Sequence, residues 1–152
     1  MNQTDARLLA ALQADSNRPI AQLAEMLAMS TSACHRRMRA LEEQGVIAGY
    51  SARVDPACLG LKLHAFVEVT LASQSREAME RFENAVAAYD EILECHLMSG
   101  NADYLLRIAV QDIDRFGDVH RECLSRLPGV ASMRSSFSIR EVKPWSGYPI
   151  PG

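Results

Sequence analysis

The chain has 152 residues, of which 48% are hydrophobic and 23% are charged, and its formal net charge at pH 7 is −3. These values are typical of a soluble globular protein, and the net charge argues against a protein that coats nucleic acid through overall basicity. No apolar run reaches the ~20 residues that a membrane-spanning helix needs, and the N-terminus has no basic leader. We therefore expect a cytoplasmic protein with no membrane partner.

Residues 1–47 predict a domain of three short helices. Thr4 is a suitable N-cap for the first helix, and a second short helix follows with apolar residues at helical spacing. The third helix extends from about Thr31 to Gln44, with Ser30 as its N-cap. Two helices joined by about three residues, the second of them rich in arginine, indicate a helix-turn-helix domain.

The third helix has two different faces at ~100° per residue. Cys34, Met38 and Leu41 share one side and are expected to be buried, while the polar and basic residues spread over the other side and a flank. Arginine can bind a guanine edge or a phosphate through two parallel hydrogen bonds, so this helix is predicted to enter the major groove of double-stranded DNA. The alternative is that the arginines only keep an exposed helix in water. The candidate DNA-binding residues are Ser30, Ser32, His35, Arg36, Arg37 and Arg39.

Residues 48–60 are interpreted as a linker, and residues 144–152 as a C-terminal tail. The linker is predicted to contain a short strand through Tyr50, Ala52 and Val54. The tail is rich in Pro and Gly and is expected to be extended or partly disordered, with its Trp and Tyr packed on a neighbouring subunit.

Residues 61–143 alternate between strand and helix patterns in the order βαββαβ. This order predicts a ferredoxin-like antiparallel sheet with both helices on one face, so the whole chain is assigned to the α+β class. The first strand alternates in hydropathy, and Phe66 lies on the side that the helices leave uncovered. An apolar side chain on an open sheet face predicts a homodimer.

Three segments carry a family pattern: DARLLAALQADSNRPIAQLAEMLAMSTSACHRRMRALEEQGVIAGYSARVDPACLG, the hairpin LMSGNADYLLRI and the ending LPGVASMRSSFSIREVK. Together they resemble the Lrp/AsnC family of feast/famine regulators over nearly the whole chain. The resemblance implies a transcription regulator with an N-terminal, winged-helix-like helix-turn-helix domain. It also implies dimers formed through the C-terminal sheet, assembly into tetramers or octamers, and a small-molecule effector, mostly an amino acid. The expected operator is a pseudo-palindrome with half-sites ~10 bp, or a multiple of that, apart. No catalytic residue, cofactor or resident metal is expected.

The resemblance places the effector beside the hairpin, with Gly100 and Asp103 in the family's G-x-x-D positions and Ser135 where the family often has a hydroxyl. Chemically, a carboxylate can bind the effector's ammonium group and backbone N–H groups its carboxylate. Asp103 can also be a turn residue that bonds its own backbone, and Ser135 an exposed strand hydroxyl. The candidate effector-binding residues are Leu97, Met98, Gly100, Asn101, Ala102, Asp103, Tyr104 and Ser135.

Two other classes of protein are alternatives to a DNA-binding regulator with an organic effector. His120 and Cys123 stand three residues apart on a predicted helix, a spacing that can hold zinc or copper in a metal- or thiol-sensing repressor. However, Cys95 and His96 point to opposite faces of their strand, and Cys123 also fits an apolar helix stripe. An enzyme is disfavoured because the sequence contains no Ser/His/Asp order, paired-carboxylate pattern or phosphate-binding glycine loop.

Overall fold

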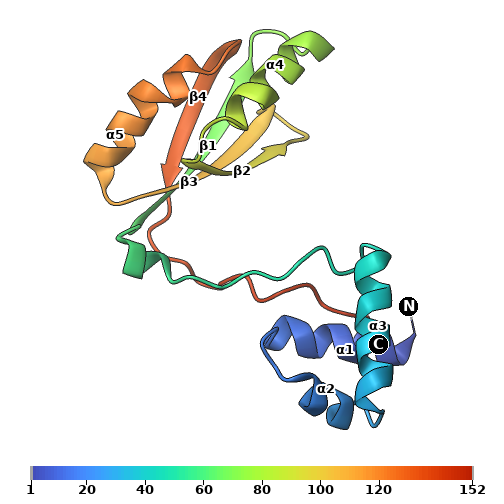
Figure 1. Ribbon diagram of the computed structural model, residues 1–152. Coiled ribbons are helices and arrows are strands. Elements are labelled where there is room, and N and C mark those ends of the chain that lie inside the picture. Colours follow the sequence, from blue (N-terminus) through green and yellow to red (C-terminus); the bar gives the residue numbers. More distant parts are fainter. Residues whose placement is uncertain (1, 152) are drawn as a thin grey trace. The chain divides into compact units, whose positions relative to one another are not determined.

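The computed structural model describes residues 2–151, which form two compact units (Figure 1). The helical unit comprises residues 2–53 together with residues 142–151, and the sheet unit comprises residues 54–141. The division falls inside the predicted linker. The C-terminal tail belongs to the helical unit, so the chain crosses from one unit to the other twice.

The helical unit contains α1 (Gln3–Ala14), α2 (Ile20–Met26) and α3 (Thr31–Glu43), as the sequence predicted. The N-cap of α1 is Asn2 rather than Thr4. The Asn2 side chain accepts a hydrogen bond from the Asp5 backbone, and the Asp5 carboxylate accepts one from the Asn2 backbone. This reciprocal capping box satisfies two donors at the helix start, which a cap at Thr4 would leave unpaired.

The predicted buried face of α3 is confirmed. Cys34 is fully buried, Leu41 is 5% exposed, and Met38 is partly buried against the same core. Leu8 and Leu23 supply the centre of that core from α1 and α2. The apolar seam of α3 therefore backs onto the other two helices and turns the opposite side outward.

The strand predicted through Tyr50, Ala52 and Val54 is absent from the structure. Residues 48–55 are extended without a ladder, and the next regular element is the 3₁₀ turn η1 (Pro56–Leu59). Alternating hydropathy is compatible with a strand, but a strand also needs a neighbour that accepts its backbone hydrogen bonds. Within the described chain this segment has none.

The tail packs on the helical unit of its own chain. The Gln13 side chain donates to the Tyr148 carbonyl at 2.9 Å and accepts from the Tyr148 backbone N–H at 2.7 Å. Arg53 donates to the Trp145 carbonyl at 3.0 Å, so the linker and the tail run side by side here (Figure 1). These bonds hold the tail against α1 and the linker.

The sheet unit has the predicted ferredoxin-like topology. Its elements are β1 (Leu63–Leu71), α4 (Arg76–Val86), β2 (Ile92–Leu97), β3 (Tyr104–Val110), α5 (Ile113–Glu122), the 3₁₀ turn η2 (Leu124–Arg126) and β4 (Val130–Phe137). The strand order is β2-β3-β1-β4, and each neighbouring pair is antiparallel. The α+β class is therefore confirmed.

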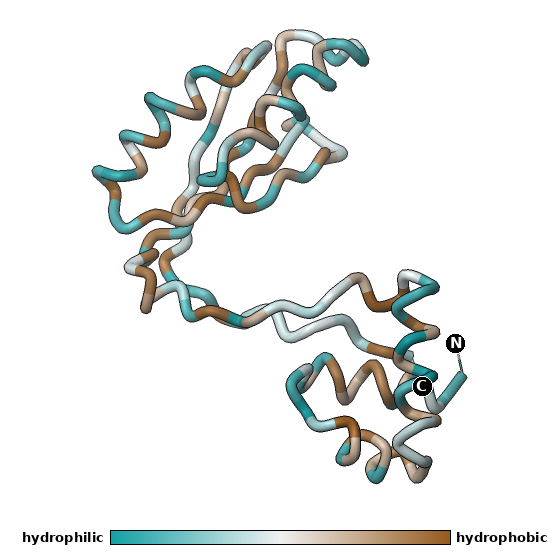
Figure 2. The backbone as a smooth tube through the Cα atoms, in the orientation of Figure 1, coloured by the Kyte–Doolittle hydropathy of each residue, from teal (hydrophilic) through white to brown (hydrophobic). Residues whose placement is uncertain are grey.

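Both helices of the sheet unit pack on one face of the sheet. Phe82 of α4 and Phe116 of α5 are buried with Val67 and Leu106 of the central strands. Along α5 the tube in Figure 2 alternates between hydrophilic and hydrophobic stretches, the pattern of a helix with one buried face.

The other sheet face is uncovered in the described chain. Phe66 is 39% exposed there, and Arg134 of β4 pairs with Glu68 of β1 at 2.6 Å. On the neighbouring strands Glu94 pairs with both Arg107 and His96. The face thus combines an aromatic side chain with charges that are already paired.

Candidate DNA-binding and effector-binding sites

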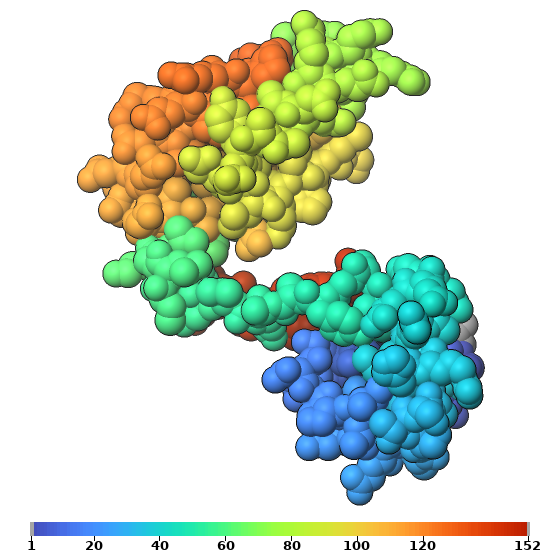
Figure 3. All heavy atoms as spheres, viewed as in Figure 1, coloured from blue at the N-terminus to red at the C-terminus, as the bar shows by residue number. Residues whose placement is uncertain are grey.

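The outward face of α3 begins at its N-cap. Ser30 accepts a hydrogen bond from the Ala33 backbone at 3.2 Å, and its hydroxyl lies 3.2 Å from that of Ser32. Both serines are exposed, as are His35 and Arg36. Figure 3 shows the atoms of α3, in cyan, on the surface of the helical unit. The helix start, with its positive dipole end, is therefore accessible to an anion.

The three arginines of α3 have different surroundings. Arg36 forms no ion pair within residues 2–151. Arg39 lies 3.6 Å from Glu43, and both side chains are more than two-thirds exposed, so this pair contributes little and can be exchanged for a phosphate contact. Arg37 instead lies 2.6 Å from Asp5 in a partly buried pair. The structure leaves Arg36 and Arg39 available to a ligand and engages Arg37 internally.

The predicted effector residue Asp103 is held by the protein itself. Its carboxylate accepts hydrogen bonds from the Leu71 backbone and from the Gln74 side chain, both at 2.7 Å. Its backbone carbonyl accepts from Met98 at 2.8 Å and closes the hairpin. Gly100 at the tip has φ of +133°, a conformation that favours glycine. Asp103 thus ties the hairpin to the end of β1, whatever else it binds.

Tyr104 and Ser135 lie on the helix-covered side of the sheet. The Tyr104 hydroxyl donates to Glu83 of α4 at 2.7 Å, and the ring is 1% exposed. Burial, and then the bond to Glu83, raise the pKa of Tyr104 above its ordinary value. Ser135 is half-buried opposite the buried Val67, whereas the hairpin residue Tyr104 stands opposite Val69. The structure does not bring Ser135 to the hairpin tip.

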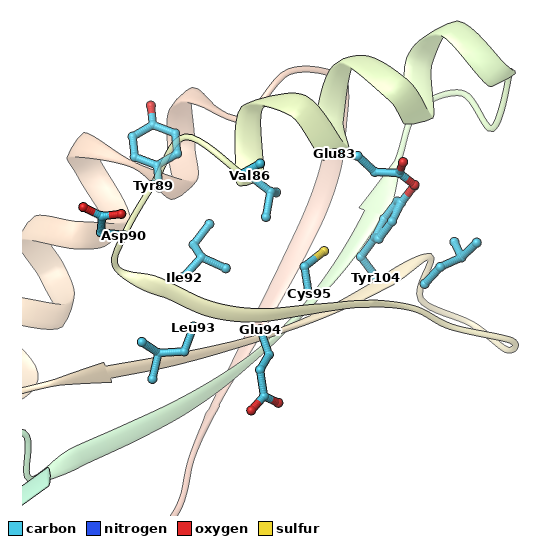
Figure 4. A pocket seen from close by; sticks show the side chains of 11 residues that line it. Glu83, Val86, Tyr89, Asp90, Ile92, Leu93, Glu94, Cys95 and Tyr104 are labelled. Carbon is cyan, nitrogen blue, oxygen red and sulfur yellow. The ribbon is translucent and has the colours of Figure 1, made fainter. Parts of the chain in front are cut away.

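A cavity of about 570 Å³ lies between α4 and β2 (Figure 4). Leu97 and Tyr104 are the two predicted effector residues that line it, together with Glu83, Cys95 and Ile92. Burial raises the pKa of the Cys95 thiol, with a smaller contribution from the charge of Glu83. The cavity has an apolar wall and a carboxylate, that of Glu83, at one side, so it can receive a small molecule with an amino group.

Three polar partners carry no signal in the sequence: Asp5 beside Arg37, Gln74 beside Asp103, and Glu83 beside Tyr104. Each lies more than 20 residues from its partner, and no local pattern marks it. The metal-sensing alternative gains no support, because residues 2–151 contain no group of three or more His, Cys, Asp or Glu that could hold a metal ion. In addition, Cys123 is buried in the apolar core.

Two family models match the chain, one over each region. Residues 1–48 match a winged helix-turn-helix DNA-binding model, and residues 64–147 match the Lrp/AsnC ligand binding domain. The chain belongs to the Lrp/AsnC family. It is therefore a transcriptional regulator with a DNA-binding and a ligand-binding region, and not an enzyme.

Individual relatives agree with membership in the Lrp/AsnC family. The leucine-responsive regulatory protein of Escherichia coli is 38% identical over 143 residues, covering 94% of this chain and 87% of that protein. An uncharacterised HTH-type transcriptional regulator of Sinorhizobium fredii is 46% identical over 114 residues, covering 75% of this chain and 90% of that protein.

Solved structures of transcriptional regulators superpose on nearly the whole chain. An AsnC family transcriptional regulator from Agrobacterium tumefaciens has a TM-score of 0.93 and 34% identity, covering 98% of this chain and 97% of that one. A transcriptional regulator from Neisseria meningitidis in complex with L-Met has a TM-score of 0.92 and 32% identity, covering 98% of this chain and 96% of that one.

In the described residues of the present chain, no helix is long and apolar enough to cross a membrane.

Proposed function

We propose that the protein is cytoplasmic and that α3 reads a pseudo-palindromic operator in double-stranded DNA. Arg36 and Arg39 are its principal contacts. The observation that carries the proposal is the exposed basic side of a helix whose opposite side is a buried apolar seam. Ser30, Ser32 and His35 flank the two arginines near the helix start, where they can reach a phosphate or a base edge. Glu42 and Glu43 confine the positive charge to the first part of the helix.

The DNA assignment is tested on an operator selected from random duplex DNA with the full chain. Arg36→Ala and Arg39→Ala should each weaken binding by roughly 5- to 150-fold, the range expected when a bidentate base contact is lost. Arg126→Ala is a matched control, because Arg126 is an exposed arginine of the sheet unit. Unchanged affinity in both α3 variants, measured by fluorescence anisotropy, would refute the assignment.

We also propose that an amino acid is the effector and that it binds at the β2–β3 hairpin. Support comes from the exposed Leu97 and Met98, which can contact an apolar side chain, and from the L-Met bound to the similar Neisseria regulator. Gly100, Asn101, Ala102 and Asp103 complete the proposed site. Tyr104 and Ser135 are assigned to the packing of the sheet rather than to the effector. Tyr104 is buried and donates its hydroxyl hydrogen to Glu83, and Ser135 stands opposite Val67, away from the hairpin tip.

Thermal-shift measurements with the common amino acids test the effector proposal. At least one amino acid should raise the melting temperature of the wild-type protein. Asp103→Ala should abolish that shift, whereas Gln74→Ala, which removes one bond to Asp103 without removing the carboxylate, should preserve it. If Asp103 only ties the hairpin to β1, both variants will melt earlier and both will still respond to the amino acid.

The third proposal is a homodimer formed through the uncovered sheet face, which can assemble further into tetramers or octamers. The exposed Phe66 and the internally paired charges around it make this face suitable for burial against a second copy. Phe66→Asp should shift the sedimentation coefficient towards the monomer. Ile113→Asp, at another exposed apolar position, should leave the assembly unchanged.

A further inference from the structure

The guanidinium of Arg37 joins the middle of α3 to the first turn of α1. Its Nη1 atom lies 2.6 Å from a carboxylate oxygen of Asp5 and 3.3 Å from the amide oxygen of Asn2. Asn2 and Asp5 are also the two members of the α1 capping box. One polar cluster therefore caps α1 and binds α3, and we refer to Asn2, Asp5 and Arg37 as the α1–α3 clamp.

The clamp differs from the other ion pair of α3 in its burial. The side chains of Arg37 and Asp5 are 35% and 15% exposed, whereas those of Arg39 and Glu43 are 71% and 72% exposed. Solvent and salt screen the partly buried pair less than the exposed one. Arg37 would have to leave a short charge-assisted contact in order to bind a phosphate, and it would then leave Asp5 partly buried without a partner.

The clamp supplies a directional contact, which the apolar seam of α3 lacks. Cys34 and Leu41 hold α3 against the core through contacts that do not depend strongly on direction. A hydrogen-bonded ion pair is directional, and it lies on the flank between the buried and exposed sides of the helix. It can therefore fix the rotation of α3 about its own axis, which decides where Arg36 and Arg39 point.

We infer that Asp5 and Arg37 are positioning residues for DNA recognition, and that Arg37 is not a phosphate ligand. The clamp would orient α3 so that Arg36 and Arg39 point towards the operator. This inference rests on the proposed function of α3 as the DNA-reading helix. It reassigns one of the six residues that the sequence placed in the DNA contact.

The salt dependence of binding separates a positioning residue from a phosphate ligand. The slope of log K against log salt concentration is negative, and each phosphate contact that is lost should make it less steep by ~0.9. Arg37→Gln should weaken operator binding roughly tenfold, about the effect of one charge-assisted hydrogen bond, and leave the slope unchanged. Arg36→Gln is the matched comparison on the adjacent residue. It removes a positive charge that faces the DNA, so it should weaken binding and make the slope less steep.

A double-mutant cycle with Asp5→Asn tests whether the two residues act through each other. Asp5→Asn alone should also weaken binding with an unchanged slope, and the double variant should lose no more than Arg37→Gln. Arg37→Lys should restore part of the affinity, since lysine can still pair with Asp5. Thermal melts of all variants identify any that fail to fold, and the isosteric Asp5→Asn variant is the one expected to preserve the core.

Three results would overturn the inference while leaving the assignment of α3 as the reading helix intact. A less steep slope for Arg37→Gln would make Arg37 a phosphate ligand. Multiplicative losses of affinity in the double variant would show that the two residues act separately. Unchanged affinity for Arg37→Gln would remove any role in recognition. If instead Arg36→Gln changes neither affinity nor slope, the assignment of α3 as the reading helix fails, and the inference about Arg37 fails with it.

Discussion

At the scale of single residues, burial decides the chemistry of the cysteines. Cys34 is fully buried and Cys123 is 2% exposed, and each lies in the apolar core of its unit. Burial raises the pKa of both thiols, and for Cys123 the pKa reaches about 11, with a smaller contribution from the charge of Glu91. The thiolate is the form that binds metals and reacts, so these two side chains serve packing.

The raised pKa of Cys123 makes a prediction about alkaline stability. An unfolded thiol with a pKa near 9.0 ionises before the folded thiol does, so the folded state binds more protons between pH ~9 and pH ~11. The free energy of unfolding should therefore fall across that window, by on the order of 2 kcal/mol from this residue. Urea unfolding at pH 8, 9, 10 and 11 measures the fall.

Two variants isolate the contribution of Cys123. Cys123→Ala lowers stability at every pH because it leaves a cavity, but its stability should decline less between pH ~9 and pH ~11 than that of the wild type. Cys58→Ala, at an exposed thiol, should decline as the wild type does. Equal declines in all three proteins would contradict the prediction.

At the scale of elements, α3 combines a structural and a binding role in the same residues. Its N-cap Ser30 accepts a hydrogen bond from the Ala33 backbone and also stands at the exposed start of the proposed DNA-reading face. A cap hydroxyl and a phosphate ligand occupy similar places in a helix-turn-helix, so the sequence pattern alone does not distinguish them. Measurements of stability and of operator affinity distinguish the capping role of Ser30 from a role as a phosphate ligand.

Ser30→Ala should lower the stability of the helical unit by about 1 kcal/mol, because a backbone donor of α3 loses its partner. Ser30→Asn should retain most of the stability, since asparagine caps helices as well as serine does. Thermal melts of both variants, run beside operator titrations, give the two readouts. If Ser30 acts only as a DNA contact, neither variant will change the melting temperature.

At the scale of the whole molecule, the last residues complete the unit formed by the first. Gln13 of α1 holds both backbone groups of Tyr148, although the two residues are 135 positions apart. Trp145 and Tyr148 pack edge to face, with ring centres 4.7 Å apart, and Ile150 packs on the core of the helices. Because the tail follows the sheet unit in sequence, it is a second covalent connection between the two units.

Gly147 is a position at which a side chain would disturb the packing of the tail on α1. A Cβ atom there would lie 2.5 Å from the Gln13 amide oxygen, and the residue has φ of +102°. Gly147→Ala should therefore detach the tail and increase chymotryptic cleavage after Trp145. Ser146→Ala is the neighbouring control and should be cleaved as slowly as the wild type.

A second variant separates the steric effect at Gly147 from the hydrogen bonds. Gln13→Ala removes both bonds to Tyr148 without creating a clash, and it should also increase cleavage after Trp145. Slow cleavage in both variants would show that Trp145 and Ile150 hold the tail without Gln13.

The sequence by itself determined the local elements and their order. Helical spacing of apolar residues and strand alternation depend only on backbone periods, so the three N-terminal helices, the buried seam of Cys34 and Leu41, and the βαββαβ order could all be predicted. Residues 48–55 show the limit of that reasoning. Their hydropathy alternates as in a strand, but they pair with no other strand in the described chain.

Only the tertiary structure decided which polar groups meet. Arg37 reaches Asp5, Asp103 reaches Gln74, and Gln13 reaches Tyr148, over separations of 29 to 135 residues. Such pairs have no sequence period, since they depend on how finished helices and strands pack. For that reason the sequence could place six residues on a DNA-reading helix, while the fold was needed to show that one of them is bound within the protein.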